Sequence, residues 1–493
     1  MRIDQGEGTK LSPPRAVHCI ENHDEAFVLW REEGFRHRVL VHVDAHHDMW
    51  WTSDSTSVTI ANFICPALRE HIVGELYWVV PDATWKTKAG RAAVCAHVRM
   101  IQRGYPEKAA PLQIEDARIR TTVLGCPFVI CSLDSLPELP DRVLLDIDTD
   151  YLVVPTVSYG GRDHFGELPW LWPQELHERL QARHVKAEFV TVAYSVEGGH
   201  TPLRWKYLGD EIAKRLRAVE SPRDLLRPYE LMREATLAAH NGDNARSARL
   251  LRGIEDAIGS APYFHLAWLA VVDGNVDAAR AWYQRALALD PSYRIVHQPD
   301  VSAMRDSASG RAIECTARNT LLLDPANASA RVALGWTAMC RREWADAENH
   351  ARTALEHEPQ LIDAHRLLGQ ALEERGRIRD AIGAFERSLT LALSGHRPLN
   401  GIVTSRPGSQ RLLDSDHART HAHLARLYAR SGDHPRAIVS FRIAIAGGID
   451  GAAIRFRLAA LYLRWRRWKE ARGQVAAGFK TMMRWRHAGE LSA

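Results

Sequence analysis

An α/β domain followed by an array of helical repeats is the fold that this sequence of 493 residues predicts. Up to about residue 218, short β-rich runs alternate with helical segments, which is typical of a sheet covered by helices. Beyond about residue 225 the strand signals vanish and a 34-residue period appears, which indicates stacked pairs of helices. We therefore expect two domains, 1–220 and 221–493.

The N-terminal domain is predicted to contain a parallel sheet. Several of its apolar runs, such as 189–194, are hydrophobic at consecutive positions, as in parallel strands that helices cover on both faces. Ligands of such sheets bind at the carboxyl ends of the strands. The segments expected as strands are 37–43, 74–80, 119–124, 127–131, 142–147 and 188–195.

Two acidic clusters stand where hydrophobic runs of this domain stop. Asp44, His46 and Asp48 occupy alternate positions in the first cluster, and Asp146 and Asp148 do so in the second. Side chains two residues apart share one face of a strand, and carboxylate and imidazole ligands on one face suit a divalent cation. Because the strand ends are expected at one edge of the sheet, the two clusters predict a binuclear metal site.

A binuclear site needs a further histidine, and His23 offers it from a loop or helix start that precedes both clusters. His42 and His47 are expected to point away from the inner cluster, and His18 is expected to lie on a strand, so these three are weaker candidates. A single aspartate at a strand end is more often a helix cap or turn residue, so the prediction rests on the whole set.

Composition and charge describe a globular protein with an uneven charge distribution. The chain is 46% hydrophobic and long enough for two or three domains with cores. Its net charge is +4, yet residues 1–218 hold about 25 basic and about 30 acidic groups, so the remainder is basic. That remainder favours an acidic partner or is a solvated helical surface. Nucleic-acid binding is not expected, because no recognition motif accompanies the charge.

Cysteine usage and the hydropathy pattern predict a cytoplasmic protein. The seven cysteines show no Cys-x-x-Cys pairing, and their odd number favours reduced thiols over a disulfide framework. The N-terminus begins Met-Arg-Ile-Asp-Gln-Gly and has no apolar export segment. No later stretch approaches the roughly 18 apolar residues that a membrane helix needs, so neither export nor insertion is expected.

The 34-residue period is marked by Pro291, Pro325 and Pro359. Small and aromatic residues recur at fixed offsets from these prolines: Ala267, Ala279 and Ala286; Gly335, Ala347 and Ala354; Gly369, Ala381 and Ser388; Ala425, Tyr428, Ala437, Phe441 and Ala444; and Ala459, Tyr462 and Ala471. The pattern resembles the tetratricopeptide repeat, in which small residues let two antiparallel helices touch and a proline stops the second. The resemblance implies a solenoid whose concave face binds a peptide or protein.

The repeat array is irregular in three places. Degenerate repeats are expected near 228–259 and 294–327, and an insertion rich in Gly, Pro and Ser interrupts the array at about 395–415. The final repeat contains the run 464–468, Arg-Trp-Arg-Arg-Trp, which is interpreted either as a basic aromatic patch or as part of a capping repeat. Self-association through the array is an open alternative to partner binding.

The acidic clusters resemble motifs of the arginase and deacetylase superfamily. Residues 44–48, Asp-Ala-His-His-Asp, and residues 146–148, Asp-Ile-Asp, look like its DAHxD and DxD motifs, in family order. Residues 191–202 resemble the end of the last core strand of arginases, where a glutamate faces the substrate guanidinium, and that role falls to Glu197. The resemblance covers about 15–217 and implies an arginase-like three-layer sandwich.

Departures from arginases indicate a divergent branch that includes peptide arginases, such as residues 22–27, Asn-His-Asp-Glu-Ala-Phe. The resemblance implies a Mn²⁺-dependent hydrolase that converts arginine in a peptide or protein to ornithine and urea. It implies two Mn²⁺ ions that activate a bridging water, with Glu197 pairing the substrate and Asp148 stabilising the tetrahedral intermediate. The implied metal ligands are His23, Asp44, His46, Asp48, Asp146 and Asp148.

Two roles in this mechanism stay open. Asp150 is either an outer residue that orients a ligand or a strand-end cap. The proton-shuttling histidine of arginases has no counterpart, since Asn62 stands close to its expected position. His47, His164 and His200 are the available substitutes.

Two other functions are compatible with the same residues. One is a metal-dependent deacetylase or other amidohydrolase with a single Zn²⁺ ion and no guanidinium-pairing glutamate. The other is a repeat scaffold whose N-terminal domain binds metal but has lost catalysis, as the absent shuttle histidine suggests. The presence of both Asp146 and Asp148 together with His23 favours two metal ions.

Overall fold

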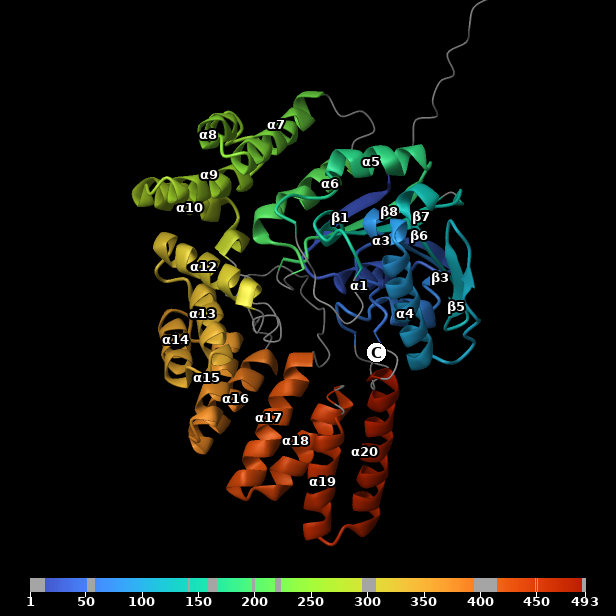
Figure 1. Ribbon diagram of the computed structural model, residues 1–493, viewed down its shortest axis with the longest axis vertical. Coiled ribbons are helices and arrows are strands. Elements are labelled where there is room, and N and C mark those ends of the chain that lie inside the picture. The colour runs from blue at the N-terminus through green and yellow to red at the C-terminus, as the bar shows by residue number, and fades with distance from the viewer. Residues whose placement is uncertain are drawn as a thin grey trace, which may run out of the picture. The chain divides into compact units, whose positions relative to one another are not determined.

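An eight-stranded sheet and a series of helix pairs make up the computed structural model of the protein (Figure 1). It describes residues 14–50, 58–140, 142–157, 166–196, 200–217, 223–294, 307–393, 415–447, 449 and 451–489. The chain divides into two compact units, of which the first holds residues 1–51 and 60–297 and the second nearly all the rest. The first unit therefore contains the sheet and the first helix pairs.

The sheet has the strand order β1-β8-β7-β2-β3-β6-β5-β4. Its strands are β1 (Ala16–Ile20), β2 (Arg38–Val43), β3 (Val73–Val80), β4 (Gln113–Ile114), β5 (Ile119–Val123), β6 (Cys126–Ser132), β7 (Val143–Asp148) and β8 (Ala187–Ala193). The six strands from β1 to β6 in this order pair in parallel, and every residue of β7 is buried. The predicted parallel core of the sheet is thus confirmed.

The other edge of the sheet is antiparallel, so the sheet is mixed and only part of it has the predicted parallel pairing. Strand β5 pairs antiparallel with β6, and β4 pairs antiparallel with β5. The two residues that join β5 to β6, Leu124 and Gly125, both have positive φ angles, of 54° and 82°. Such a two-residue connection returns the chain directly beside the preceding strand and leaves no room for a crossover helix.

Helices lie on both sides of the sheet: in Figure 1, α5 and α6 run along one side of the strands and α1 and α4 along the other. Helix α6 contacts β1 and β8, whereas α2 contacts β3 and α3 contacts β6. The helices are α1 (Glu25–Glu32), α2 (Ile64–Arg69), α3 (Asp82–Lys86), α4 (Lys88–Gly104), α5 (Pro173–Ala182) and α6 (Tyr207–Arg217), with short 3-10 turns η1 (Leu133–Ser135), η2 (Thr149–Leu152) and η3 (Leu203–Trp205).

Antiparallel helix pairs follow the sheet domain, as the 34-residue period predicts. In the first unit they are α7 (Arg223–His240), α8 (Asn244–Arg252), α9 (Ala261–Val272) and α10 (Val276–Leu289), followed by η4 (Pro291–Arg294). In the second unit they are α12 (Ser307–Leu323), α13 (Ala328–Cys340), α14 (Trp344–His357), α15 (Ile362–Glu374), α16 (Ile378–Leu393), α17 (Ser415–Ser431), α18 (His434–Ala446), α19 (Ala452–Arg464) and α20 (Trp468–Gly489). Helices α10, α12 and α14 each end two residues before Pro291, Pro325 or Pro359, so the prolines act as the predicted stops.

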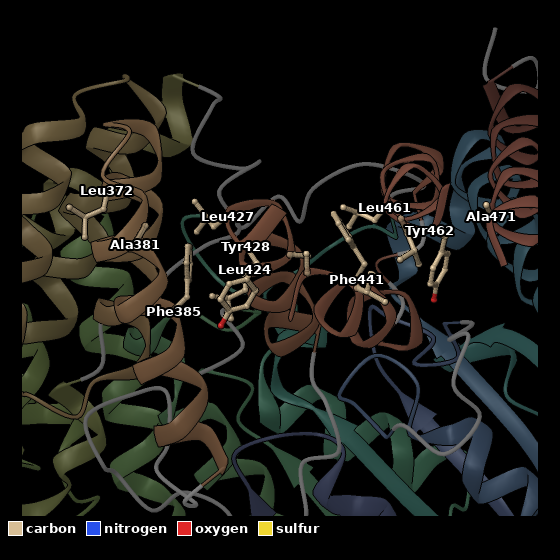
Figure 2. Close-up of a cluster of buried hydrophobic side chains, with 14 residues drawn as sticks. Leu372, Ala381, Phe385, Leu424, Leu427, Tyr428, Phe441, Leu461, Tyr462 and Ala471 are labelled. Atoms are coloured by element: carbon tan, nitrogen blue, oxygen red, sulfur yellow. The ribbon is translucent and has the colours of Figure 1, made fainter. Parts of the chain in front are cut away.

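Small residues at the repeat positions let neighbouring helices approach closely. Ala279, Ala347, Ala381 and Ala437 are all fully buried, as the tetratricopeptide pattern requires. Figure 2 shows one core of the second unit, in which Phe385 and other apolar side chains from α15 to α20 pack together. This core includes residues on both sides of the predicted insertion at 395–415, of which 395–414 lie outside the described residues, so the packing of helices continues across it.

The turn inside each helix pair requires a left-handed backbone at a position that repeats with the helices. Gly274, Gly376 and Gly432 occupy it with φ angles of 73°, 74° and 86°. Arg342 and Arg466 occupy the same position in two other pairs, with φ angles of 63° and 55°. Glycine reaches this conformation at little cost, whereas the two arginines adopt it under the constraint of their repeat.

Contacts inside the first unit attach the first helix pairs to the sheet domain. Lys206, which follows η3, donates a hydrogen bond to Asp290 at the end of α10, with 2.6 Å between Nζ and Oδ2. The same ammonium group lies 4.5 Å from the ring centre of Tyr194 and 5.5 Å from that of Tyr293. The imidazole Nε2 of His265 lies 3.0 Å from the carbonyl oxygen of Arg204. These polar contacts fix the orientation of α9 and α10 on the sheet domain.

All seven cysteines lie in described segments and are free thiols, as their number and spacing predict. Burial raises the pKa of Cys65 and of Cys131 to about 12, which makes these thiols unreactive. Among the described helices, none is long and apolar enough to span a membrane.

Gly369 should tolerate no side chain, because a Cβ atom there would lie 2.8 Å from the buried ring of Phe385. We expect Gly369→Ala to destabilise the second unit by about 1–3 kcal/mol, since the ring has to move within a packed core. Gly383, in the next helix, has open space around its Cα, so Gly383→Ala should instead stabilise by about 0.5–1 kcal/mol. Urea unfolding of the full chain measures both, and shifts of equal sign would contradict the packing described.

His265 should make the first unit lose stability as the pH falls. Burial lowers its pKa to about 4; the hydrogen bond to the Arg204 backbone opposes this shift, and the positive charge of Arg204 adds to it. Because the unfolded chain binds the proton near pH 6.5, stability is complete above that pH and declines toward pH 4. Relative to His265→Gln, which keeps an amide donor for the Arg204 carbonyl, the wild type should lose on the order of 1 kcal/mol between pH 7 and 5. If the thermal midpoints of the wild type and His265→Gln change by the same amount between pH 7 and 5, the effect is excluded.

Candidate metal centre

The carboxyl ends of four neighbouring strands, β1, β8, β7 and β2, carry the predicted site residues. His23 lies between β1 and α1, and Asp44 comes directly after β2. Asp146 and Asp148 lie among the last three residues of β7, and both are buried. Since parallel strands end at the same edge of a sheet, segments that are far apart in sequence meet here. The structure therefore brings the two predicted acidic clusters together.

Six buried residues form what we call the inner cluster: His23, His42, Asp44, Asp48, Asp146 and Asp148. Nδ1 of His23 lies 3.2 Å from Oδ2 of Asp44, 3.2 Å from Oδ2 of Asp48 and 3.1 Å from Oδ2 of Asp148. Its other ring nitrogen, Nε2, lies 2.8 Å from Oδ2 of Asp146. One imidazole N–H cannot serve three carboxylate oxygens, so negative charge is in excess around this point.

His42 belongs to the inner cluster, and the prediction that it points away is wrong. Its Nδ1 lies 2.8 Å from Oδ2 of Asp146, and its Nε2 lies 3.2 Å from Oδ2 of Asp44. Residues 42 and 44 are two apart on β2 and its extension, so their side chains share a face. In addition, His42 is directly opposite Asp146 in the pairing of β2 with β7. The alternation places His42 on the same face as Asp44, and the register of β2 with β7 brings it to Asp146.

Mutual charges set the protonation of the inner cluster. Burial alone would lower the pKa of His23, but the carboxylates around it, Asp146 first among them, raise it well above its usual range. Burial raises the pKa of Asp48, and the charge of Asp44 adds to this rise. For Asp146, burial is outweighed by the charge and hydrogen bonds of His23 and His42, which lower its pKa. The carboxylates of the cluster are thus held in place by groups of opposite charge.

The residues of the inner cluster fit a divalent cation. Among the described residues, Nδ1 of His23, Nε2 of His42 and Oδ2 of Asp44 are buried and have no hydrogen-bond partner. The two nitrogens each lie 3.2 Å from that oxygen. Buried polar atoms without partners are costly, whereas imidazole nitrogen and carboxylate oxygen together are ligands for Mn²⁺, Fe²⁺ or Zn²⁺. The donor set therefore agrees with the predicted metal site.

His46 takes a different place from the one predicted for it. It forms what we call the outer group with Asp150 and His200, whose potential ligand atoms lie within 4.8 Å of one another. Nδ1 of His46 lies 2.8 Å from Oδ2 of Asp150 and 3.5 Å from Oδ1 of Asp44. The His46 side chain is 28% exposed, whereas Asp150 is fully buried. His46 thus adjoins the inner cluster on a more accessible side.

Two hydroxyl groups that the sequence analysis missed orient the carboxylates. Thr191 donates a hydrogen bond to Asp146, its neighbour in the pairing of β8 with β7. Ser195 donates from Oγ to Oδ2 of Asp148 at 2.6 Å. The backbone N–H of Asp150 donates to Oδ1 of Asp148. Thr191 could have been found only from the register of β8 against β7, which a single sequence does not reveal.

The remaining predicted residues lie away from the cluster or outside the described segments. Glu197 and His164 fall in segments 197–199 and 158–165, outside the described residues. His47 is buried against Trp78 and His97, and its Nδ1 accepts a hydrogen bond from the backbone of Met49. Burial, His97 and His46 lower its pKa well below the usual range. His18 stacks on Phe189, with ring centres 4.9 Å apart. Asn62 is buried.

The final repeat presents its aromatic run to solvent. Trp465 is 47% exposed and Trp468 is 63% exposed, and Arg464, Arg466 and Arg467 are exposed as well. Phe479, further along α20, is also exposed. A repeat that only caps the array would present a polar outer face, so these exposed rings agree with the interpretation as a basic aromatic patch.

Comparison with known families confirms the repeats. The tetratricopeptide repeat model matches residues 232–294 and 332–394. The chain therefore contains tetratricopeptide repeats, including the degenerate one expected to begin near 228. No curated protein matches the sequence.

Three solved tetratricopeptide structures similar to this chain each cover less than half of it. The crystal structure of MamA has 16% identity, with 38% of this chain and 98% of that chain covered and a TM-score of 0.30. YrrB, described as a TPR protein with an unusual peptide-binding site, has 15% identity, with coverage of 47% and 90% and a TM-score of 0.26. PilF of Pseudomonas aeruginosa has 16% identity, with coverage of 46% and 90% and a TM-score of 0.30.

Removal of one inner carboxylate should separate a metal site from a structural ion-pair network. Without metal, Asp48→Asn should leave the thermal midpoint equal or higher, because it removes a buried charge that Asp44 repels. Added Mn²⁺ should stabilise the wild type, by about 2.7 kcal/mol at one hundred times the dissociation constant. It should stabilise Asp48→Asn far less.

The control for this experiment is Asp273→Asn, which alters an exposed aspartate at the end of α9 and should respond to Mn²⁺ like the wild type. A midpoint of Asp48→Asn that falls equally with and without Mn²⁺ would mean that the carboxylate only stabilises the fold.

Proposed function

We propose that the sheet domain is a Mn²⁺-dependent hydrolase of the arginine guanidinium group, acting on arginine within a peptide or protein and releasing urea from an ornithine residue. The observation that supports it most strongly is the convergence of four aspartates and two histidines at adjacent parallel strand ends. The similarity of residues 44–48 and 146–148 to the arginase motifs supplies the reaction class. An arginase-like arrangement of the sheet domain belongs to the same proposal.

The chain's residues have separate tasks in this proposal. When bound, Mn²⁺ would supply Lewis acidity and activate water near neutral pH. The inner cluster, with Asp44 at its centre, would hold the cation and keep its imidazoles and carboxylates in position. Ser195 fixes the orientation of Asp148, whose carboxylate would face the charge that develops at the substrate carbon.

Glu197 is proposed to pair with the guanidinium nitrogens through charge-assisted hydrogen bonds. The residues on either side of its segment are fixed next to the metal centre. The N–H of Val196 donates to Oε1 of Glu21 at 2.8 Å, and the N–H of His200 donates to the carbonyl oxygen of Ser195 at 3.1 Å. His200, the first described residue after Glu197, belongs to the outer group and therefore lies at the proposed site.

The repeats are proposed to hold the peptide or protein substrate. Tetratricopeptide arrays present extended surfaces to protein partners, and an enzyme for free arginine has no need of one. Binding the substrate away from its arginine raises the effective concentration of the side chain at the metal centre. The exposed arginines and tryptophans of the final repeat favour an acidic stretch in such a substrate. Self-association through the same surface is the competing use.

Urea release should distinguish this function from its alternatives. With Mn²⁺, the full chain should form urea from arginine-containing peptides faster than from free arginine. We expect Asp146→Asn to reduce the rate by at least about a hundredfold, because it removes charge from the centre of the cluster. Glu197→Gln should lower kcat/KM by a factor that corresponds to a loss of about 2–3 kcal/mol of transition-state stabilisation, because a neutral amide pairs weakly with guanidinium. A colorimetric urea assay measures both variants.

Glu178→Gln, an exposed change on α5, is the matched control and should keep full activity. Release of acetate from acetylated lysine with one Zn²⁺ per chain would favour a deacetylase instead. Bound Mn²⁺ without turnover of any arginine-containing peptide would favour a scaffold with a silent metal domain.

A further inference from the structure

We propose that, of the two cations that the arginase resemblance implies, the outer one is bound by His46 together with Asp150 and His200. This inference rests on the proposed metal-dependent function and names the ligands of its second ion. It departs from the set that the arginase resemblance implies, in which neither Asp150 nor His200 is a ligand.

The outer group has the composition and the spacing of a cation site. Its three potential ligand atoms, two imidazole nitrogens and a carboxylate oxygen, lie within 4.8 Å of one another. The rings of His46 and His200 meet edge to face, with centres 4.8 Å apart and planes at 70°. Two imidazoles and a carboxylate form a common ligand set for a divalent ion that keeps open positions.

Asp150 supplies an independent indication of a ligand. The residue is fully buried, and within the described part of the chain neither of its carboxylate oxygens accepts a hydrogen bond. Its contact is the imidazole of His46, at 2.8 Å. A buried carboxylate of this kind is stabilised most directly by a cation beside it.

Asp44 is placed to join the two positions, because its oxygens face different sides. Oδ2 lies 3.2 Å from the ring nitrogens of His23 and His42 in the inner cluster. Oδ1 accepts a hydrogen bond from the backbone N–H of His46 at 2.6 Å and lies 3.5 Å from Nδ1 of that residue. Each carboxylate oxygen has two lone-pair directions, so Oδ1 retains one for a cation. A carboxylate shared in this way is typical of two ions a few ångströms apart.

The inner and outer cation positions differ in their exposure to solvent, so we assign them different roles. The side chains of Asp44, Asp48 and Asp148 are at most 9% exposed, whereas His46 is 28% exposed. Substrate therefore reaches the outer position first, and the inner cation anchors the bridge. As a ligand, His200 has its lone pair committed and does not shuttle protons.

Metal stoichiometry tests the assignment without reference to activity. The full chain, stripped with a chelator and reloaded with Mn²⁺, is analysed for bound metal by mass spectrometry and for spin coupling by low-temperature EPR. The wild type should bind two ions per chain with a coupled spectrum, which tests the bridge without any variant. Asp150→Asn, which keeps the shape of the side chain, and His200→Ala should each halve the stoichiometry and leave an uncoupled signal.

The control is His184→Asn, an exposed substitution that should retain both ions. Two coupled ions in both Asp150→Asn and His200→Ala would overturn the outer ligand set. One ion in the wild type would overturn the second position but leave the proposed hydrolase with a mononuclear site. No bound Mn²⁺ would overturn both. A wild type with two coupled ions and no urea release would overturn the proposed reaction and leave the ligands as assigned.

Discussion

The burial of several carboxylates at one edge of a parallel sheet is the constraint on which the rest of this protein depends. Each of Asp44, Asp48, Asp146 and Asp148 has a carboxylate oxygen within 3.2 Å of a ring nitrogen of His23. Like charges brought so close repel strongly in a buried environment, and the histidines offset only part of that repulsion. A fold that keeps them together needs a rigid scaffold and a site for positive charge.

The sheet provides the scaffold because β7 is apolar up to its acidic end. The residues of β7 before Asp146 are all buried hydrophobic side chains, and the neighbouring strands β2 and β8 are buried over all but their first two residues. The packing energy of the strands therefore holds the charged ends in place, and the hydroxyls of Thr191 and Ser195 orient them. Apolar packing and buried charge are thus divided along the length of one strand.

The helical repeats follow a different principle, in which each helix pair depends on its neighbours. Small side chains such as Ala381 and glycines such as Gly369 allow close contact, and aromatic rings such as Phe385 fill the space between pairs. The array is attached to the sheet domain at one end by Lys206 and Asp290.

The sequence by itself determined that a sheet is followed by helical repeats, the helix stops at Pro291, Pro325 and Pro359, six of the eight strands and both acidic motifs. These features depend on local periodicity and on side-chain chemistry, which a single chain displays directly. The antiparallel edge escaped prediction because the turn at Leu124 and Gly125 has a weak signature.

Only the tertiary structure decided which groups complete the site. His42 enters the inner cluster through its pairing with Asp146, and Thr191 does so through the pairing of β8 with β7. Asp150 and His46 meet because two strand ends that are a hundred residues apart lie side by side. The physical reason is that hydrogen-bonded register between distant strands, which no local pattern encodes, sets which side chains become neighbours.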